Sequence, residues 1–305
     1  MKVIYITEKS RLIDYQGSIL GVGIFDGVHL GHQRIIGKIV HEAGKLKSPG
    51  AILTFNPHPA NVLDPKSKIK LLQSFKQRKQ SLESLGIDLL FVIRFNREFA
   101  KLSYKQFFKK ILVDLIRPQV TVIGTDFRFG KDVRGNVARL SILGKDAGIR
   151  VSPVAPYKKD GYKISSSLIR NLLKRGQIQR VNKFLGRPYS IEGRVVRGKK
   201  IGTKLGFPTV NIRYDNSLIL PLGIFRGFLL INRRKYKAAI YIGLKPTFNL
   251  RLKKPVLEAH ILHFKRSVYG QKVEVFLWRK IRSDRKFNTI ESLRKAIKED
   301  IKAIK

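Results

Sequence analysis

The chain contains no cysteine, and this absence excludes several kinds of chemistry. Without a thiol there is no disulfide framework, no thiolate nucleophile and no cysteine-ligated zinc or iron–sulfur site. Long apolar runs are missing too, because charged residues make up 28% of the 305 positions and interrupt the hydrophobic segments. We therefore expect no membrane span and no membrane partner. The 43% of hydrophobic residues is nevertheless too high for a disordered chain and predicts a folded, soluble one.

The beginning of the chain bears on location. Its first apolar run, residues 1–6, is followed within three positions by Glu8 and Lys9. Such a run is too short for the apolar centre of a signal peptide. We therefore expect a cytoplasmic protein.

Acidic residues are scarce: 21 of them face 63 lysines and arginines, which gives a net charge of +42. A charge of this size usually suggests nucleic-acid binding. Here it is evenly spread, since residues 1–185 and residues 186–305 each carry a net charge of +21. Without a separate basic tail, we expect no specific nucleic-acid partner, and the positive field would speed encounters with nucleotides. No feature of the sequence indicates an oligomeric state.

The first part of the chain alternates between strand-like and helix-like segments. Apolar runs over residues 18–25, 50–55, 89–95 and 120–124 predict strands, and residues 29–45, 76–85 and 104–116 predict helices. Strands separated by helices form parallel sheets that are covered on both faces. The sequence therefore predicts an α/β domain built on a parallel sheet.

From about Ser190 the pattern changes to short strands separated by turns. Strands are predicted over residues 190–197, 209–212, 227–231, 237–243, 255–264 and 273–279. This spacing is typical of a small antiparallel β-barrel, so we predict two domains, residues 1–185 and 186–305. A carboxy-terminal helix is predicted with Asn288 as its cap and an apolar face formed by Ile290, Leu293, Ile297, Ile301 and Ile304.

A turn with two histidines follows the first buried strand. Residues 23–32 read Gly-Ile-Phe-Asp-Gly-Val-His-Leu-Gly-His, and Asp26 with Gly27 is expected to turn the chain into a helix that begins near His29. His29 and His32 would lie on one face at the start of that helix, where backbone amides favour an anion. For His-x-x-His alone an exposed pair is the simpler interpretation, and zinc lacks a third ligand nearby. Because strand, turn and helix are all present, the pattern favours a phosphate clamp.

A second helix start reads Ile-Ser-Ser-Ser-Leu-Ile-Arg over residues 164–170. Ser165 or Ser166 can cap this helix, and Arg170 lies one turn further, where its guanidinium can bind phosphate oxygens. Alone, the segment would be a capped helix with a surface arginine. We predict that it faces the two histidines across a polyphosphate, because two helix starts would clamp the phosphates for transfer without a covalent intermediate.

The barrel part carries polar residues on two predicted strands. Residues 206–211, Gly-Phe-Pro-Thr-Val-Asn, enter a strand on which Thr209 and Asn211 point to the same face. Their oxygen atoms suit Mg²⁺ held together with ATP phosphates, although a hydrogen-bonded pair is the commoner role of an isolated Thr-x-Asn. Glu258 is the only acid within residues 216–273, and an acid in an apolar strand is usually paired or functional. A carboxylate near a primary hydroxyl can act as general base.

Four motifs together resemble those of the bifunctional bacterial riboflavin kinase/FAD synthetase family. They are Gly-x-Phe-Asp-Gly-Val-His-x-Gly-His at 23–32, Thr-Phe-Asn-Pro-His-Pro at 54–59, Gly-Thr-Asp-Phe-Arg-Phe-Gly at 124–130 and Ile-Ser-Ser-Ser-x-Ile-Arg at 164–170. Their order and spacing agree along the whole chain. The resemblance implies that the first domain is a Rossmann-like nucleotidyltransferase of the His-x-Gly-His superfamily, which adenylylates FMN with ATP to give FAD and pyrophosphate.

The resemblance also implies roles for single residues of this domain. His29 and His32 would stabilise the triphosphate as pyrophosphate leaves, with Ser166 and Arg170 on the other side. Other motif residues would line the nucleotide and flavin sites: Gly23, Phe25, Asp26, Gly27, Asn56, Pro57, His58, Pro59, Asp126, Phe127 and Ser165. Taken without the resemblance, His58 is a loop residue between two prolines, with its role open.

The second domain resembles the riboflavin kinase signature. The matching residues are Gly-Phe-Pro-Thr-x-Asn at 206–211, Ile-Gly-x-x-Pro-Thr-Phe at 242–248, Glu258 with His260, and Tyr269-Gly270. The resemblance implies a six-stranded barrel that phosphorylates riboflavin to FMN, with Glu258 as the base. Nucleotide contacts would come from Gly206 and Pro208, and Mg-ATP would bind at Thr209 and Asn211.

The sequence departs from the kinase pattern at four positions. Arg197 and Thr203 stand where a histidine and an arginine are expected, Phe225 replaces a tyrosine in a turn that is one residue short, and His263 replaces an aspartate. We expect these departures to change the loop geometry and the kinase rate more than the reaction itself, because Thr209, Asn211 and Glu258 are retained.

Two other functions stand as alternatives. His-x-Gly-His does not name the acceptor, so a different adenylyl or cytidylyl transferase with an accessory barrel would fit the first domain. The stretch at 206–211 argues against it. An RNA-binding protein on the same fold is supported only by the net charge.

Overall fold

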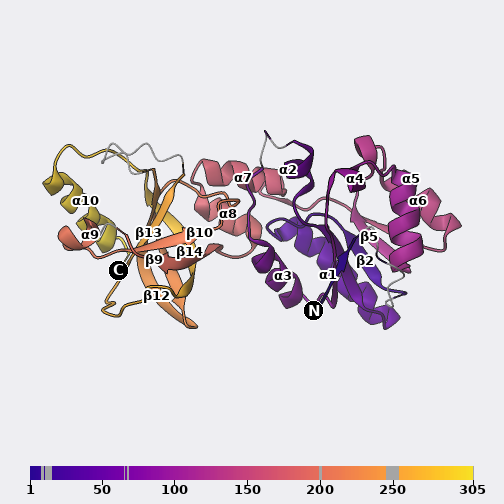
Figure 1. Ribbon diagram of the computed structural model, residues 1–305, viewed down its shortest axis with the longest axis horizontal. Helices are drawn as coiled ribbons and strands as arrows, with labels where there is room; N and C mark the ends of the chain where they lie inside the picture. Colours follow the sequence, from indigo (N-terminus) through magenta and orange to yellow (C-terminus); the bar gives the residue numbers. More distant parts are fainter. Residues whose placement is uncertain are drawn as a thin grey trace. The chain divides into compact units, whose positions relative to one another are not determined.

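The computed structural model describes residues 1–7, 10, 16–64, 66, 69–198, 201–244 and 254–304. The chain forms two compact units (Figure 1). The first comprises residues 1–69 with 75–165, and the second comprises residues 70–74 with 166–305. The compact units thus divide at 165/166, whereas the functional boundary at 185/186 stays a prediction.

The first unit is built on a six-stranded sheet in which all neighbouring strands run parallel. In order across the sheet the strands are β1 (Lys2–Ile6), β4 (Leu89–Ile93), β3 (Gly50–Phe55), β2 (Ile19–Val22), β5 (Val120–Gly124) and β6 (Arg150–Val154). The predicted parallel sheet is confirmed. The edge strands β1 and β6 were not predicted, since each joins the sheet along one side only.

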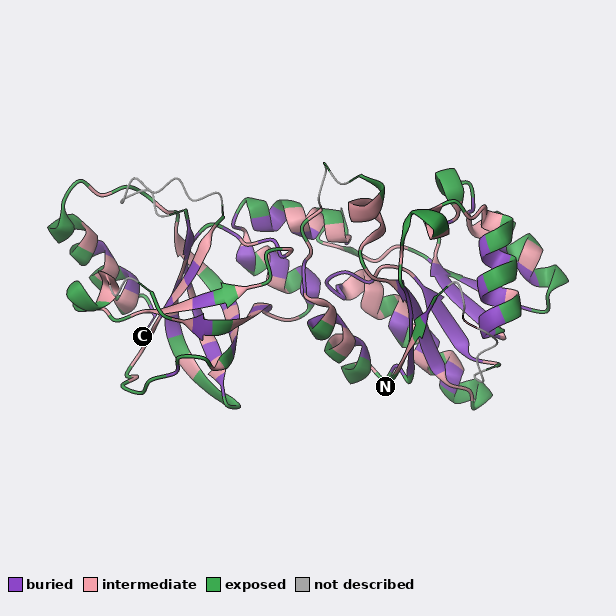
Figure 2. Cartoon of the chain, in the orientation of Figure 1, coloured by how far each residue is buried: buried purple, intermediate pink, exposed green. Residues whose placement is uncertain are grey.

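Helices cover both faces of this sheet, whose strands are largely buried (Figure 2). The helical elements are α1 (Leu30–Leu46), α2 (Pro59–Leu63), α3 (Phe75–Ser84), α4 (Arg97–Ala100), α5 (Tyr104–Phe107), η1 (Phe108–Ile116), η2 (Lys131–Val133) and α6 (Val137–Asp146). Ile39 of α1 and Leu82 of α3 share one apolar cluster with Ile52 of β3. Leu53, the next residue of β3, belongs to a second cluster with Leu112 of η1. Successive strand residues therefore supply opposite cores.

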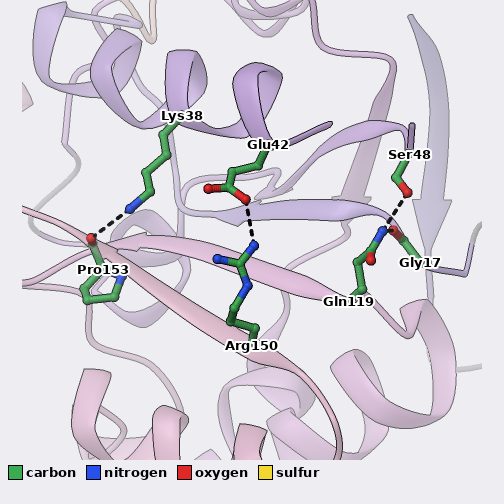
Figure 3. A network of polar contacts seen from close by, with 7 residues as sticks. All are labelled: Gly17, Lys38, Glu42, Ser48, Gln119, Arg150 and Pro153. Carbon is green, nitrogen blue, oxygen red and sulfur yellow. Dashed lines mark hydrogen bonds and ion pairs between the residues drawn. The ribbon is translucent and has the colours of Figure 1, made fainter. Parts of the chain in front are cut away.

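Polar contacts attach α1 to the strands beside it (Figure 3). Arg150, at the start of β6, donates to Glu42 of α1 at 2.6 Å, and this hydrogen bond is the main cause that lowers the pKa of the Glu42 carboxyl. Lys38 of the same helix reaches the Pro153 carbonyl oxygen at 3.5 Å. Two residues one turn apart on α1, the helix that begins at the paired histidines, therefore contact strand β6.

The second unit contains a closed barrel of six antiparallel strands, drawn mainly in orange in Figure 1. Around the barrel the strands are β10 (Val210–Tyr214), β13 (Val256–Ile261), β12 (Arg234–Gly243), β11 (Gly223–Ile231), β14 (Lys272–Arg282) and β9 (Tyr189–Val196). The predicted barrel is confirmed. Its helices are α7 (Ser166–Lys174), α8 (Ile178–Leu185), α9 (Ile201–Lys204) and α10 (Ile290–Lys302), and the hairpin β7 (Lys158–Lys159) with β8 (Tyr162–Lys163) belongs to the first unit.

The carboxy-terminal helix α10 starts differently from the prediction. Thr289, not Asn288, is its cap, because the Thr289 hydroxyl oxygen accepts the amide of Ser292 at 3.1 Å. The predicted apolar face is also shorter, since Ile290 is 62% exposed whereas Ile304 is buried. None of the helices in the described ranges is long and apolar enough to cross a membrane.

Candidate functional site

Three of the predicted site segments leave the same edge of the parallel sheet. Strands β3, β2 and β5 are neighbours and run in one direction, so their carboxyl ends lie at one edge. Residues 23–29 follow β2, residues 56–59 follow β3 and residues 125–127 follow β5. From β2 the chain continues to β3 on one side of β2, whereas β5 and then β6 lie on its other side, so the strand order reverses between β2 and β5. Open parallel sheets bind ligands at such a reversal.

The turn after β2 has a strained backbone that its packing maintains. Gly23 still belongs to the sheet edge, since its amide donates to the Leu53 carbonyl oxygen at 3.0 Å. Phe25 and Val28 then take φ angles of 54° and 39°, values that side chains other than glycine rarely adopt. Both side chains are buried, as is Asp26 between them. Gly27, with φ of 85°, supplies the left-handed residue that the turn requires.

The two histidines lie together at the start of α1. His29 precedes the helix as its cap, and its Nδ1 accepts the amide of His32 at 3.3 Å. The sequence placed both histidines on one helical face. In the structure His32 is a helical residue, and His29 lies one position before the helix. The imidazole rings are nevertheless stacked, with centroids 3.7 Å apart and planes inclined by 17°. His29 is buried and His32 is half-buried.

Gly31 makes room for this arrangement. A Cβ atom at this position would lie 3.2 Å from the His29 ring and 3.2 Å from the Ile164 carbonyl oxygen. Such contacts are tighter than almost all real ones, so any other residue would displace the ring or the chain after β8.

The segment after β3 forms a short helix start of its own. The Asn56–Pro57 peptide bond is cis. His58 is the cap of α2, and its Nδ1 accepts the amide of Ala60 at 3.2 Å, while Pro59 is the first helical residue. The loop histidine thus has a local structural role, which the residue pattern alone left open.

The segment after β5 presents one charged and one aromatic side chain. Asp126 is exposed and accepts a hydrogen bond from Lys163 at 2.7 Å, which lowers the pKa of its carboxyl. Phe127 is half-buried and its ring is stacked on that of Phe129, with centroids 5.3 Å apart. Phe129 in turn contacts Phe107, so the half-buried Phe127 ring is backed by buried aromatic side chains.

The Ser-Ser-Ser segment lies where the two compact units divide. Ser165 ends the first unit and Ser166 is the first residue of α7 in the second. Arg170, one turn into α7, is half-buried and donates through Nε to the Lys70 carbonyl oxygen at 2.8 Å. The helix ends at Lys174, shortly before Gly176, which has φ of 67°. That this segment faces the histidines stays a prediction.

The second unit has a pocket between the barrel and helices α9 and α10. Its lining is mainly apolar with several polar side chains, a combination that is typical of sites for small organic ligands. The apolar lining includes Leu205, Phe207, Ile224, Leu293, Ile297 and Ile301, and the polar lining includes Thr209, Tyr241, Glu258, His260 and Asp284. The apolar face predicted for the last helix therefore covers this pocket.

Glu258 is the centre of a row of polar side chains. It lies directly opposite Asn211 on β10 and directly opposite Tyr241 on β12, so the three side chains share one face of the barrel wall. The Tyr241 hydroxyl donates to the Asp284 carboxylate at 2.9 Å, and Tyr241, Asp284 and Glu258 all line the pocket. Asp284 and Tyr241 were not singled out from sequence, because neither stands in an unusual local pattern.

Thr209 and Asn211 are flanked by two glycines that leave no room for a side chain. A Cβ atom at Gly198 would lie 2.1 Å from Asn211 Nδ2, and one at Gly202 would lie 2.9 Å from Thr209 Oγ1 and 2.5 Å from the Phe207 carbonyl oxygen. The backbone at Gly198 therefore approaches Asn211 closely, and the backbone at Gly202 approaches Thr209 closely. Close backbone approach to a polar site is a recurring use of glycine.

The residues just before Thr209 are held from the neighbouring strand. Gly206 has φ of 88°, which favours glycine there. The Pro208 carbonyl oxygen and His260 Nδ1 are hydrogen-bonded at 2.8 Å. This bond fixes the entry to β10 beside the strand that carries Glu258.

Substituting either flanking glycine should damage the barrel site selectively. Thr209 and Asn211 are the residues predicted to bind Mg-ATP. We expect Gly198→Ala and Gly202→Ala to lower the rate of the reaction at this barrel site by about tenfold or more, since small displacements at a reacting centre have large effects on rate. Gly37→Ala on α1, where a Cβ meets nothing within 4 Å, is the matched control and should leave that activity unchanged. Steady-state kinetics of the three variants measures the effect, and equal rates would contradict the close-packing argument.

An ion pair joins α10 to the barrel beside the pocket. Arg282 donates through Nε to Asp300 Oδ1 at 2.9 Å and through its terminal nitrogen to Oδ2 at 2.7 Å. The Asp300 side chain is only 8% exposed. The pair is bidentate and connects β14 directly to the helix that closes the pocket.

Removing the cation of this pair should destabilise the second unit. Arg282→Met leaves the Asp300 carboxylate buried without its counter-ion, and we expect the free energy of unfolding to fall by about 3 kcal/mol. Arg279→Met, at an exposed position on the same strand, should change it by less than about 0.5 kcal/mol. Chemical denaturation of both variants tests this, and equal midpoints would contradict it.

The departures from the kinase pattern have distinct surroundings. Arg197 lies over the Tyr269 ring at 6.0 Å. Thr203 is on the short helix α9, Phe225 is fully buried in β11, and His263 takes φ of 53° in the turn after β13. Of the motif at 242–248, residues 245–248 lie outside the described residues.

Comparison with known proteins gives two family models in succession. The FAD synthetase model matches residues 13–168, and the riboflavin kinase model matches residues 185–305. A bifunctional riboflavin kinase/FMN adenylyltransferase from Bacillus subtilis is 37% identical over 98% of this chain and 96% of its own length. The chain belongs to the bifunctional riboflavin kinase/FMN adenylyltransferase family.

Other relatives in this family also match nearly end to end. The Buchnera aphidicola (Schizaphis graminum) enzyme is 35% identical over 94% of this chain and 93% of its own, and the Escherichia coli K12 enzyme is 29% identical over 98% and 96%. A crystal structure from Streptococcus pneumoniae, described as a macrolide-efflux protein, has a TM-score of 0.89 and is 28% identical, covering 99% of this chain and 98% of that one.

Within the family, each model matches one of the two architectures. The FAD synthetase model includes the histidine turn and the segments after β3 and β5, and the riboflavin kinase model includes the complete barrel with α10. Residues 169–184, which contain most of α7 and α8, fall between the two models.

Proposed function

We propose that this chain phosphorylates riboflavin to FMN in the barrel and adenylylates FMN to FAD at the edge of the parallel sheet, with ATP as the donor in both steps. The observation that carries the proposal is that each of the two folds has its own polar site, and that the family model matching each fold describes one of the two activities. Riboflavin, FMN and ATP are the partners that this function requires.

In the adenylyl transfer, a phosphate oxygen of FMN attacks the α-phosphorus of ATP and the bond to pyrophosphate breaks. Pyrophosphate gains negative charge as it leaves, and preorganised donors at that point lower the barrier. Because His29 Nδ1 accepts the His32 amide, the proton of a neutral His29 ring is on Nε2, which can donate to a phosphate oxygen. The stacked His32 ring and the amides at the start of α1 would stabilise the same charge.

The remaining residues of the first site would hold the substrates. Ser166 and Arg170 would bind the phosphates from the other side, with Ser165 at the start of their helix. Residues 56–59 with Asp126 would line the nucleotide site. The half-buried Phe127 ring, supported by Phe129, would stack on the flavin.

In the kinase reaction, the 5′-hydroxyl of riboflavin attacks the γ-phosphorus of ATP and ADP leaves. Glu258 lines the pocket and would accept the hydroxyl proton as the oxygen attacks. Its neighbours in register, Asn211 and Tyr241, would orient the phosphate and the carboxylate. The apolar surface from α10 would hold the flavin ring.

The donor set beside Glu258 fits Mg²⁺ as a partner of ATP. Thr209 and Asn211 supply neutral oxygen ligands, and the close approach of Gly198 and Gly202 leaves a cradle beside them that a Cβ atom would fill. When bound there with ATP, Mg²⁺ would neutralise phosphate charge. Thr209 and Asn211 are the residues we propose to hold it.

The direct test is incubation of the purified chain with riboflavin and Mg-ATP, with separation of riboflavin, FMN and FAD by chromatography. We expect FMN to appear first and FAD to follow. Transfer of a nucleotide only to another acceptor would favour the alternative nucleotidyltransferase. Salt-sensitive RNA binding with no ATP turnover on flavin would favour the nucleic-acid alternative, for which the even spread of charge gives no support.

A further inference from the structure

Arg78 is a buried cation behind the histidine turn. It lies on α3, a helix whose sequence Phe-Lys-Gln-Arg-Lys-Gln-Ser-Leu-Glu-Ser is mostly polar. The residue is only 7% exposed, whereas its neighbour Lys76 is exposed and Lys79 is half-buried. A guanidinium placed in a protein interior costs desolvation free energy, so its partners indicate what it does there.

The guanidinium of Arg78 bridges two segments of the first site. One terminal nitrogen donates to the Ile24 carbonyl oxygen at 2.6 Å, and the other donates to the Phe55 carbonyl oxygen at 3.4 Å. Ile24 belongs to the turn that leads to the histidines, and Phe55 directly precedes the segment 56–59. The Thr54 hydroxyl reinforces the same junction, since it donates to the Ile24 carbonyl oxygen at 3.0 Å.

The charge state of Arg78 suits this role. Burial lowers the pKa of its guanidinium to about 10, and attraction to the buried Asp26 carboxylate opposes that shift. At neutral pH the side chain is therefore still a cation with all five N–H donors. The guanidinium carbon of Arg78 lies over the ring of Phe75, 5.0 Å from the ring centroid. A lysine would keep the charge but lacks the planar fork that reaches two carbonyls at once.

We propose that Arg78 is a positioning residue for adenylyl transfer, which sets the spacing between the histidine turn and the segment 56–59 by binding the Ile24 carbonyl oxygen of the turn and the Phe55 carbonyl oxygen directly before the segment. The proposal rests on the function proposed above for the histidine site. Arg78 touches neither substrate nor reacting atoms in this assignment. It acts through the turn, whose strained residues Phe25 and Val28 would otherwise relax.

Fold stability alone does not account for these contacts. The Ile24 carbonyl oxygen already accepts the Thr54 hydroxyl, so its burial does not require a desolvated cation as a further donor. A bridge between two backbone segments of one proposed site instead provides geometric precision, on which rates depend steeply.

The decisive experiment compares Arg78→Met with wild type in the full chain. We expect kcat for FAD formation from FMN to fall about 100-fold, while KM for ATP changes less than about threefold, because displaced groups affect the transition state more than initial binding. Measured well below the unfolding midpoint, the riboflavin kinase rate of the same preparation should stay near wild type, because the barrel belongs to the other compact unit. Lys79→Met, the adjacent basic residue on α3, is the matched control and should leave all of these readouts unchanged.

A merely structural Arg78 would lower the unfolding midpoint and reduce both activities together, and that result would overturn the proposal, as would an unchanged kcat. If Arg78→Met does not fold, Arg78→Lys decides: a kcat at least about fivefold lower at a normal midpoint supports the forked bridge, and a wild-type kcat overturns it. Failure of the histidine site itself is recognised separately, because FAD formation would then survive removal of both imidazoles.

Discussion

A variant that lacks both imidazoles at the start of α1, His29→Ala with His32→Ala, should form FMN from riboflavin and ATP but no detectable FAD. Removing one preorganised donor from a transition-state site typically lowers kcat by about 100-fold or more, and two stacked donors are lost here. The barrel is a separate compact unit with its own pocket, so riboflavin phosphorylation should be unaffected. Chromatography of the reaction products measures both steps at once.

The control for this variant lies on the same helix. His41 is exposed on α1, three turns after the histidine pair, and His41→Ala should leave both products at wild-type levels. Equal loss of FMN and FAD in the double variant would count against separate sites. Full retention of FAD formation would remove the two imidazoles from the reaction.

The second large effect is expected from Glu258→Gln. This change keeps the size of the side chain and its place between Asn211 and Tyr241, but removes the group that accepts the riboflavin proton. Loss of a general base typically costs about 100-fold to 10,000-fold in rate. Riboflavin phosphorylation should fall by this amount, while added FMN is still converted to FAD.

The exposed Glu291 on α10 provides the matched control, because Glu291→Gln changes the same functional group on a helix that lines the same pocket. It should phosphorylate riboflavin at the wild-type rate. An unchanged rate in Glu258→Gln would exclude Glu258 as the base and shift attention to Asp284, another carboxylate that lines the pocket.

The main elements of both folds could be predicted because their hydrophobic patterns are local. The strands 50–55 and 120–124 were predicted with the bounds that the structure has, since each is a continuous apolar run in the middle of a parallel sheet. The cap of α10 was misplaced by one residue because Asn288 and Thr289 are both good caps, and only the path of the chain before the helix selects between them.

Residues that act through long-range contacts escaped prediction. Arg78 is one basic residue in a polar helix, and its burial depends on carbonyl groups of residues 24 and 55. Tyr241 and Asp284 meet across 43 positions of sequence. Gly198 and Gly202 attract notice only when the side chains of Asn211 and Thr209 are placed beside them. No short pattern records such contacts.

By itself the sequence determined the two fold types, the segment with the paired histidines and the isolated acid of the barrel, because periodicity and residue chemistry are properties of short stretches. The tertiary structure alone decided that the two imidazoles stack, that Glu258 lies between Asn211 and Tyr241, and that α10 covers the pocket. These arrangements follow from sheet register and packing, which join residues far apart in the chain and are selected by the free energy of the whole fold.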